Sequence, residues 1–212
     1  AGDGAPIVRP APATAGDGAP VVRPARASDA RAIARLHREA LPRAFLPALG
    51  EAFLAELYRA LAADPGSVVL AAEEGGRVVG FAAGTASVRR FYRRFALRHG
   101  ARAAALAAPR LLRPDVLRRA LETAAYPGRA DGLPDAELLA IAVAPGSRAR
   151  GVGRALATGV LDRLAARGAR RVKVVVDAGN EPANRFYRSL GFRLGERIAV
   201  HDGTASNAWV IG

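Results

Sequence analysis

The chain has 212 residues, which is enough for one domain with an insertion and a terminal extension. Half of the residues are hydrophobic, so a core can be buried, and cysteine is absent, which excludes disulfides, thiolate metal sites and thiol nucleophiles. The formal net charge is +13, and nearly all of the positive charge is arginine because Lys173 is the only lysine.

The N-terminal segment contains a direct repeat. Residues 1–14 read AGDGAPIVRPAPAT, and residues 15–28 read AGDGAPVVRPARAS. Only the second copy leads into a helical pattern, so we expect it to supply the first strand, over residues 20–26, with Ser28 as the N-cap of the next helix. We expect residues 1–19 to form a flexible duplicated tail and residues 20–212 to form the folded domain.

The next elements change from helical to strand periodicity. Apolar residues at helical spacing predict a helix over residues 51–62, and Asp64-Pro65-Gly66 ends it. Residues 67–72 and 77–85 are typical of two strands, and the two glycines between them predict a hairpin turn.

Residues 87–131 interrupt this strand pattern. Helical spacing, punctuated by Pro109 and Pro114, predicts two or three helices inserted between the third and fourth strands. We favour a packed cap over one face of the sheet. A helix lying on a membrane surface is less favoured, because most of the apolar positions are alanine. Arginines crowd the start of the insertion and could attract an acidic acceptor, or could form a solvated basic face: Arg89, Arg90, Arg93, Arg94 and Arg98.

The C-terminal part alternates regularly. It predicts a strand at 137–143, a helix at 151–167, a valine-rich strand at 171–176, a short helix at 181–190 and a hairpin formed by residues 192–200 and 205–211 around Asp202-Gly203. Strands and helices in this order predict a mixed α/β (α+β) fold, with a central sheet flanked by helices.

The loop between the strand at 137–143 and the following helix carries a motif for binding an anion. Residues 148–153 read RARGVG, and Arg154 follows. A helix start presents unpaired N–H groups, glycines allow close approach of the backbone, and arginines add charge, so the motif is typical of a phosphate or pyrophosphate cradle. An ordinary glycine-rich turn is the structural alternative. A dinucleotide-binding unit is disfavoured, because Leu156 stands where its third glycine would be.

A second motif follows, NEPANRFY at residues 180–187, with Gly191-Phe192 behind it. Together the two motifs resemble those of the GNAT acyl-CoA-dependent N-acyltransferases, in order and in spacing. The resemblance is specific over residues 137–192 and looser over residues 21–85. It implies a GNAT-like fold and an enzyme that transfers an acetyl group from acetyl-CoA to a primary amine, which attacks the thioester directly.

The resemblance also implies roles for individual residues. The strand around Ala142 would pair with the pantetheine arm, the RARGVGR loop would hold the pyrophosphate, and Tyr187 would protonate the leaving thiolate. The residues that it assigns to the acyl-CoA site are Ile141, Ala142, Val143, Arg148, Ala149, Arg150, Gly151, Val152, Gly153, Arg154, Asn180, Ala183 and Tyr187.

Glu137 is the preferred general base, because it begins the central strand and shares strand parity with Ile141 and Val143. An exposed strand end is the alternative reading of this residue. Asp135, His37 and His201 are held in reserve.

Two other classes of function remain open at this stage. One is a non-catalytic acyl-CoA-binding or sensor module, and the other is a basic nucleic-acid-binding protein, which no recognisable nucleic-acid motif supports. The arginine content fits either an anionic ligand such as coenzyme A or a compositional habit of the source genome. We expect a cytoplasmic protein without a metal or a membrane contact. A homodimer and the identity of the acceptor stay open.

Overall fold

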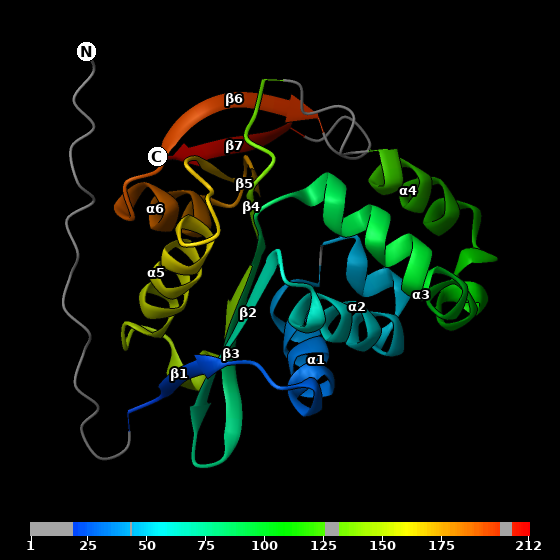
Figure 1. Cartoon of the computed structure of the whole chain (residues 1–212), viewed down its shortest axis with the longest axis horizontal. Helices are drawn as coiled ribbons and strands as arrows, with labels where there is room; N and C mark the ends of the chain where they lie inside the picture. Colours follow the sequence, from blue (N-terminus) through cyan, green and yellow to red (C-terminus); the bar gives the residue numbers. More distant parts are fainter. Residues whose placement is uncertain (1–18, 43, 126–131, 200–204) are drawn as a thin grey trace.

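The computed structural model describes residues 19–42, 44–125, 132–199 and 205–212. Strands (β), α-helices (α) and short 3-10 helices (η) follow one another along the chain (Figure 1). They are β1 (Val21–Pro24), η1 (Ala27–Asp29), α1 (Ala30–Ala40), η2 (Leu46–Leu49), α2 (Glu51–Ala63), β2 (Ser67–Glu74), β3 (Arg77–Thr85), α3 (Val88–Leu111), α4 (Pro114–Ala125), β4 (Glu137–Val143), η4 (Pro145–Ser147), α5 (Val152–Ala165), β5 (Val172–Asp177), α6 (Glu181–Ser189), β6 (Arg193–Ala199) and β7 (Ala205–Ile211).

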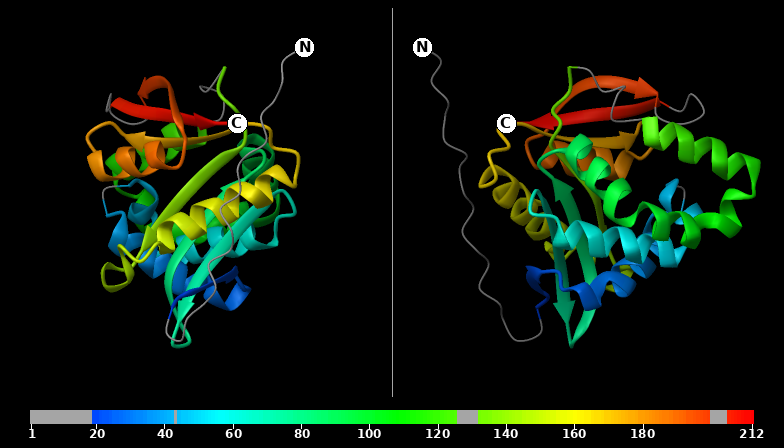
Figure 2. Two further views of the ribbon diagram at one scale, coloured as in Figure 1. Left: turned by 90° about the vertical axis from the view of Figure 1, so that its left-hand side faces the viewer. Right: turned by 45° about the vertical axis from the view of Figure 1, so that its right-hand side comes forward.

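The seven strands form one sheet in the order β1-β2-β3-β4-β5-β7-β6. Neighbouring strands are antiparallel except β4 and β5, which are parallel. Helices α1 and α2 cover one face of the sheet, and α5 and α6 cover the other (Figures 1 and 2). The predicted mixed α/β fold is confirmed, and the largely antiparallel order excludes a doubly wound dinucleotide-binding sheet.

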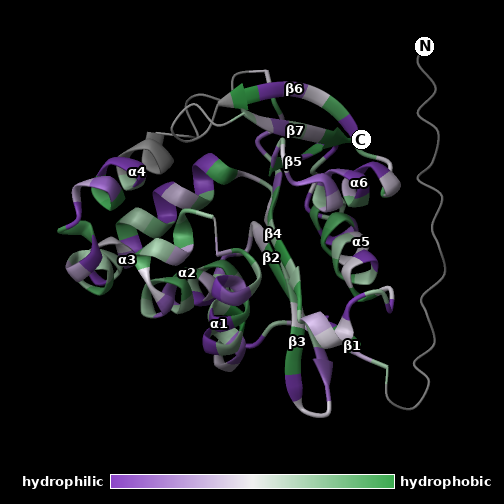
Figure 3. Cartoon of the chain, turned by 180° about the vertical axis from the view of Figure 1, so that it is seen from behind, coloured by the Kyte–Doolittle hydropathy of each residue, from purple (hydrophilic) through white to green (hydrophobic). Residues whose placement is uncertain are grey.

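Each face of the sheet has its own apolar core. On the α1–α2 face, Ile33, Leu54 and Phe81 are at most 1% exposed. On the α5 face, Leu156 and Val160 of α5 are 0% exposed and pack with strand residues of the same cluster. The hydropathy colouring shows the middle of the sheet as mainly hydrophobic (Figure 3). The sheet is therefore buried on both sides, and its ends and edges are left for polar chemistry.

The first strand comes from the second copy of the repeat. Val21 pairs with Glu73 of β2, and the Ala25 amide donates to the Val69 carbonyl at 2.9 Å. Ser28 is not the N-cap, because it lies inside η1. The turn is closed instead by Asp29, whose carboxylate accepts a hydrogen bond from the Arg26 amide at 2.7 Å. The first copy lies outside the described residues.

Deleting residues 1–14 is expected to leave the melting temperature unchanged. The second copy already fills the strand position next to β2 and reaches α1 through a short loop, whereas the first copy would have to close a longer one. Thermal melts of the full chain and of the truncated chain test this expectation. Unfolding of the truncated chain would place residues 1–14 inside the domain.

The insertion between β3 and β4 consists, within the described residues, of α3 and α4. Helix α3 packs against α2, and its Phe91 and Phe95 share the apolar core of the α1–α2 face with Phe81 of β3, so the start of the insertion caps this face of the sheet. Buried Glu56 of α2 is the main polar attachment: its carboxylate lies 2.9 Å from His99 Nδ1 and 3.2 Å from Arg102 Nε. The insertion thus forms a second layer outside α2 (Figure 2).

Pro109 does not separate two helices, because it lies inside α3, and α4 begins at Pro114. Pro109 is tolerated since α3 ends two residues later, at Leu111, so that few helical hydrogen bonds are lost. No helix of the described chain is both long enough and apolar enough to cross a membrane, α3 included. Strands β6 and β7 form the predicted C-terminal antiparallel pair, but the predicted turn at Asp202-Gly203 lies outside the described residues.

Candidate functional site

Strands β4 and β5 touch at one end only. Glu137 and Lys173 form their one ladder pair within the described residues, supported by a 2.9 Å hydrogen bond from the Lys173 amide to the Ala136 carbonyl. On its other side β4 stays paired with β3 as far as Val143, which pairs with Gly80. Within the described residues, no strand therefore pairs with the β5-facing edge of β4 along Ile141, Ala142 and Val143. An extended ligand could add there as a strand.

A β-bulge in β4 lies at the point where the two strands part. Ala83 pairs with Ala140 and Gly84 with Leu138, so Leu139 is an extra residue without a partner in β3. A bulge of one residue reverses which side chains share a face.

The predicted parity of Glu137 with Ile141 and Val143 is therefore wrong. Ile141 and Val143 pack in the α5-side core. Glu137 points to the opposite face, because its partner Lys173 lies between Val172 and Val174, which both belong to the α5-side core. The proposed base and the open strand edge are thus reached from different sides of the sheet.

The cradle follows directly after β4. Ala149 has a φ of 60° and Gly151 a φ of 77°, and Ala149 is the one non-glycine residue with positive φ in the described part of the chain. Such strained backbone is often found at ligand-binding turns. The first backbone hydrogen bond of α5 runs from the Ala155 amide to the Gly151 carbonyl, so the helix leaves the amides of Val152, Gly153 and Arg154 unused. This arrangement leaves three backbone amides at the start of α5 that could bind an anion.

Three arginines surround this cradle, and each is anchored by a contact. Arg148 Nε donates to the Val143 carbonyl at 3.0 Å, and Arg154 Nη2 donates to Ser189 Oγ at 3.0 Å. Arg150 Nη1 lies 2.7 Å from a carboxylate oxygen of Glu74 and holds the pKa of that carboxyl below its ordinary value. A guanidinium has five N–H donors, so Arg148 and Arg154 can hold an anion without giving up these contacts.

The loop after β5 is fixed by two asparagines. Asn180 caps α6, because its Oδ1 accepts the Ala183 amide at 3.2 Å, so its side-chain NH2 group can donate to a ligand. Asn184 is buried, and its Nδ2 donates to the Asp177 and Asn180 carbonyls at 3.0 and 2.8 Å.

The other end of the Asn184 amide ties α6 to the last strand. Asn184 Oδ1 accepts Trp209 Nε1 at 2.8 Å and Asn207 Nδ2 at 3.0 Å. Asn184 was not among the residues predicted from the sequence. The one feature of the sequence that could have indicated Asn184 is its position, one helical turn after Asn180.

Tyr187 lies on the buried side of α6. Its ring packs edge-on against Phe186 and Phe192, with centroids 5.2 and 5.6 Å away. No group of the described residues hydrogen-bonds to its hydroxyl. Burial raises the pKa of the phenol, so the proton is retained. A neutral phenol of this kind can donate a proton, so the predicted role of Tyr187 stays a prediction.

Glu137 is not an exposed strand end, since it is only 7% exposed. Its carboxylate lies 3.3 Å from the ammonium of Lys173, which also donates to the Pro134 carbonyl at 2.5 Å. Burial, with repulsion from the Glu137 carboxylate, raises the pKa of nearby Tyr92 to about 12. Lys173 is a second residue that was not predicted from the sequence. The one feature of the sequence that could have indicated Lys173 is that it is the single lysine of the chain.

The reserve bases are not available in the same way. Asp135 accepts hydrogen bonds from Ser87 Oγ at 2.6 Å and from the Arg89 amide at 3.2 Å, so it holds the start of α3. His37 is buried beside Tyr58, and burial lowers the pKa of its imidazole to about 4. His201 lies outside the described residues.

Three comparisons bear on this site. The model of the acetyltransferase (GNAT) family matches residues 31–192. A mycothiol acetyltransferase of Beutenbergia cavernae is 42% identical over 72 residues, which are 32% of this chain and 23% of that protein, so the chain spans less than a quarter of this relative.

Solved structures resemble the whole fold. A structure described as SsHAT matches with a TM-score of 0.60 and 26% identity, and the match covers 91% of this chain and 98% of that one. A phosphinothricin acetyltransferase of Sinorhizobium meliloti, solved in complex with AcCoA, matches with a TM-score of 0.56 and 19% identity, over 91% of this chain and 88% of that one.

Proposed function

The chain belongs to the acetyltransferase (GNAT) family, and on that premise we propose that it transfers the acetyl group of acetyl-CoA to a primary amine. The observation that carries the proposal is the parting of β4 from β5 directly beside the RARGVGR cradle. An open strand edge that leads to a helix start suits a ligand with an extended amide arm and a pyrophosphate.

The donor side is assigned to the residues that line this opening. The edge at Ile141, Ala142 and Val143 would hydrogen-bond the pantetheine amides. The amides of Val152 and Gly153, with the arginines of the cradle, would hold the pyrophosphate. Asn180 would donate to the pantetheine, and Ala183 would leave room for it because its side chain is a single methyl group.

The acceptor side needs a base and an acid. The amine nitrogen attacks the thioester carbon, the C–S bond breaks, and the sulfur leaves as a thiolate. Glu137 would take the proton that the amine loses, and Tyr187 would give the thiolate its proton. No covalent bond to the protein is required, which agrees with a chain that has no cysteine.

Release of the free CoA thiol in the presence of a panel of amines tests the function. The panel should include a small primary amine, an amino sugar and a peptide with a free N-terminus. Binding of acetyl-CoA without thiol release with any amine would favour the non-catalytic sensor. Absence of acetyl-CoA binding would contradict the whole proposal and reopen the nucleic-acid alternative. Light scattering of the same preparation tests for a homodimer.

Replacing Glu137 with glutamine is expected to lower kcat/KM at neutral pH by roughly 10²-fold, the usual contribution of a positioned base. The rate should recover as the pH rises toward about 10, where a simple alkylamine loses its proton without help. A pH profile of kcat/KM for wild type and variant measures this. A residual rate that stays flat across pH would count against Glu137 as the base.

The control for this variant must account for Lys173, because glutamine leaves a buried ammonium without its partner carboxylate. The double variant Glu137→Gln, Lys173→Met removes both charges. It should regain stability in thermal melts but keep the low rate at neutral pH. If the double variant regains activity, the single variant lost it by disturbing the fold.

A further inference from the structure

A row of buried polar side chains crosses the sheet at the end where β4 and β5 meet. Ser67 of β2 pairs with Thr85 of β3, Thr85 with Glu137 of β4, and Glu137 with Lys173 of β5. Directly paired residues project from the same face, and a 3.0 Å hydrogen bond between Ser67 Oγ and Thr85 Oγ1 agrees with this. The four residues are between 1% and 7% exposed. The row leads from the Glu137–Lys173 pair toward the start of α3.

A pocket of about 220 Å³ lies at the far end of this row. It lies where four segments meet: the turn between α2 and β2, the end of β3, the start of α3 and the loop after α5. Thr85 belongs both to the row and to the wall of the pocket, and Phe91 adds an apolar surface. The pocket is therefore one strand away from Glu137.

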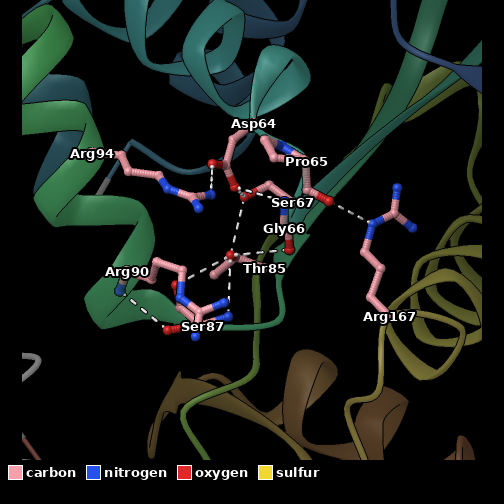
Figure 4. Close-up of polar contacts among 9 residues, drawn as sticks. All are labelled: Asp64, Pro65, Gly66, Ser67, Thr85, Ser87, Arg90, Arg94 and Arg167. Atoms are coloured by element: carbon pink, nitrogen blue, oxygen red, sulfur yellow. Dashed lines mark hydrogen bonds and ion pairs between the residues drawn. The ribbon is translucent and has the colours of Figure 1, made fainter.

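The wall of the pocket carries net positive charge. Arg90 of α3 and Arg167 of the loop after α5 line it from opposite sides (Figure 4). Asp64 is the one carboxylate in the lining, and it is already bound: Arg94 Nη1 lies 3.0 Å from its Oδ1, and Ser67 Oγ donates to its Oδ2 at 2.8 Å.

The two lining arginines differ in how firmly they are held. Arg167 is fixed in place, with Nε on the Pro65 carbonyl at 3.0 Å and Nη1 on the Arg163 carbonyl at 2.9 Å. The side chain of Arg90 lies across the Thr85–Ser87 end of β3 in Figure 4, and no ion pair joins it to a carboxylate of the described residues. Arg90 is thus the cation with the most donors to offer a ligand.

This pocket is separate from the acyl-CoA cradle. The cradle lies at the N-terminal end of α5, whereas Arg167 and Gly168 follow its C-terminal end. Helix α5 has 14 residues, which at 1.5 Å per residue places the two sites about 20 Å apart.

We propose that this pocket binds the anionic group of the acceptor, so that the substrate is a primary amine that also carries a carboxylate or a phosphate. The anion lies against Arg90 and Arg167, and the amine is directed toward Glu137, which pairs with Thr85 of the pocket wall. Adjacent strands are about 4.8 Å apart, so the amine and the anion are separated by about 5–10 Å. A γ-amino acid, a short peptide with free ends or an aminoalkyl phosphate has this spacing. The inference rests on the proposed function.

The test compares matched amines on the intact protein. γ-Aminobutyrate and aminoethyl phosphate each carry an anionic group besides the amine. Butylamine lacks such a group and is the comparison amine. With wild type, the anionic amines should show a KM at least about tenfold lower than butylamine, as expected for one charge-assisted pair. Arg90→Gln should remove that difference and leave the affinity for acetyl-CoA unchanged. The carboxylate and phosphate arms show which anion the pocket prefers.

Arg93→Gln is the matched control, because Arg93 is exposed on the same helix and does not line the pocket. It removes the same charge and should leave the KM of γ-aminobutyrate nearly unchanged. Equal KM values for the anionic and neutral amines, or equal effects of the two variants, would overturn the inference while acetyl transfer itself stands.

A binding measurement separates failure of the inference from failure of the proposed function. If no amine releases the thiol, the proposed function fails. Calorimetry with inorganic phosphate and with γ-aminobutyrate still measures binding to the pocket. Binding that is weakened by Arg90→Gln but not by Arg93→Gln would support an anion site. Absence of binding would overturn the inference.

Discussion

Replacing Gly151 with valine is expected to weaken acetyl-CoA binding by about tenfold or more while the protein remains folded. Gly151 has a φ of 77°, and a Cβ added there would meet no atom of the described residues within 4 Å. The added side chain would therefore occupy open space beside the amides at the start of α5, where the pyrophosphate is proposed to bind. Loss of a charge-assisted hydrogen bond or two accounts for a change of this size.

Gly132→Val is the matched control for backbone strain. Gly132 has a φ of 92°, and an added Cβ there also meets no atom of the described residues within 4 Å, but it precedes β4 and lies outside the cradle. Both variants introduce a similar backbone strain, so both should have a lower melting temperature than wild type. Calorimetric titration with acetyl-CoA should separate them. Unchanged affinity in folded Gly151→Val would remove the cradle from the donor site.

The cradle could be predicted from the sequence because all of its parts are neighbours along the chain. A strand, a loop with glycine at 151 and a helix start follow one another, so the positive φ and the unused amides need no distant contact. The same holds for Asn180, since an asparagine before a short amphipathic helix predicts the capping contact with Ala183.

The orientation of Glu137 could not be predicted, because it depends on pairing with another strand. Period-two alternation along 137–143 holds only if β4 has no bulge, and the extra residue at Leu139 is defined by the register against β3. Lys173 and Thr85 were missed for the same reason. Each comes next to Glu137 only when the strands align at one end of the sheet.

The placement of the insertion depended on a buried charge. Periodicity predicts that α3 has an apolar stripe, but not which surface covers it. Glu56 looks like an ordinary surface residue of α2, yet it is 4% exposed and contacts His99, 43 positions later. A contact of that kind can direct α3 onto α2, and helical periodicity does not predict it.

Replacing Tyr187 with phenylalanine is expected to lower kcat by about 10²-fold, with the affinity for acetyl-CoA nearly unchanged. The ring is held by Phe186 and Phe192, and the hydroxyl donates to no group of the described residues, so phenylalanine should keep the packing. Stopped-flow or steady-state thiol release measures kcat, and calorimetry measures the affinity.

The pH dependence sharpens the assignment of Tyr187. Burial raises the pKa of the phenol, so the neutral form is favoured in the folded protein, and the proton stays available at neutral and mildly alkaline pH. Wild-type kcat should therefore show no descending limb below about pH 10, the ordinary pKa of tyrosine.

Tyr58→Phe serves as the control, because it removes a buried hydroxyl on the other face of the sheet and should leave kcat unchanged. Parallel losses of rate and acetyl-CoA affinity in Tyr187→Phe would assign the residue to binding or packing, and the proton for the thiolate would then have to come from solvent.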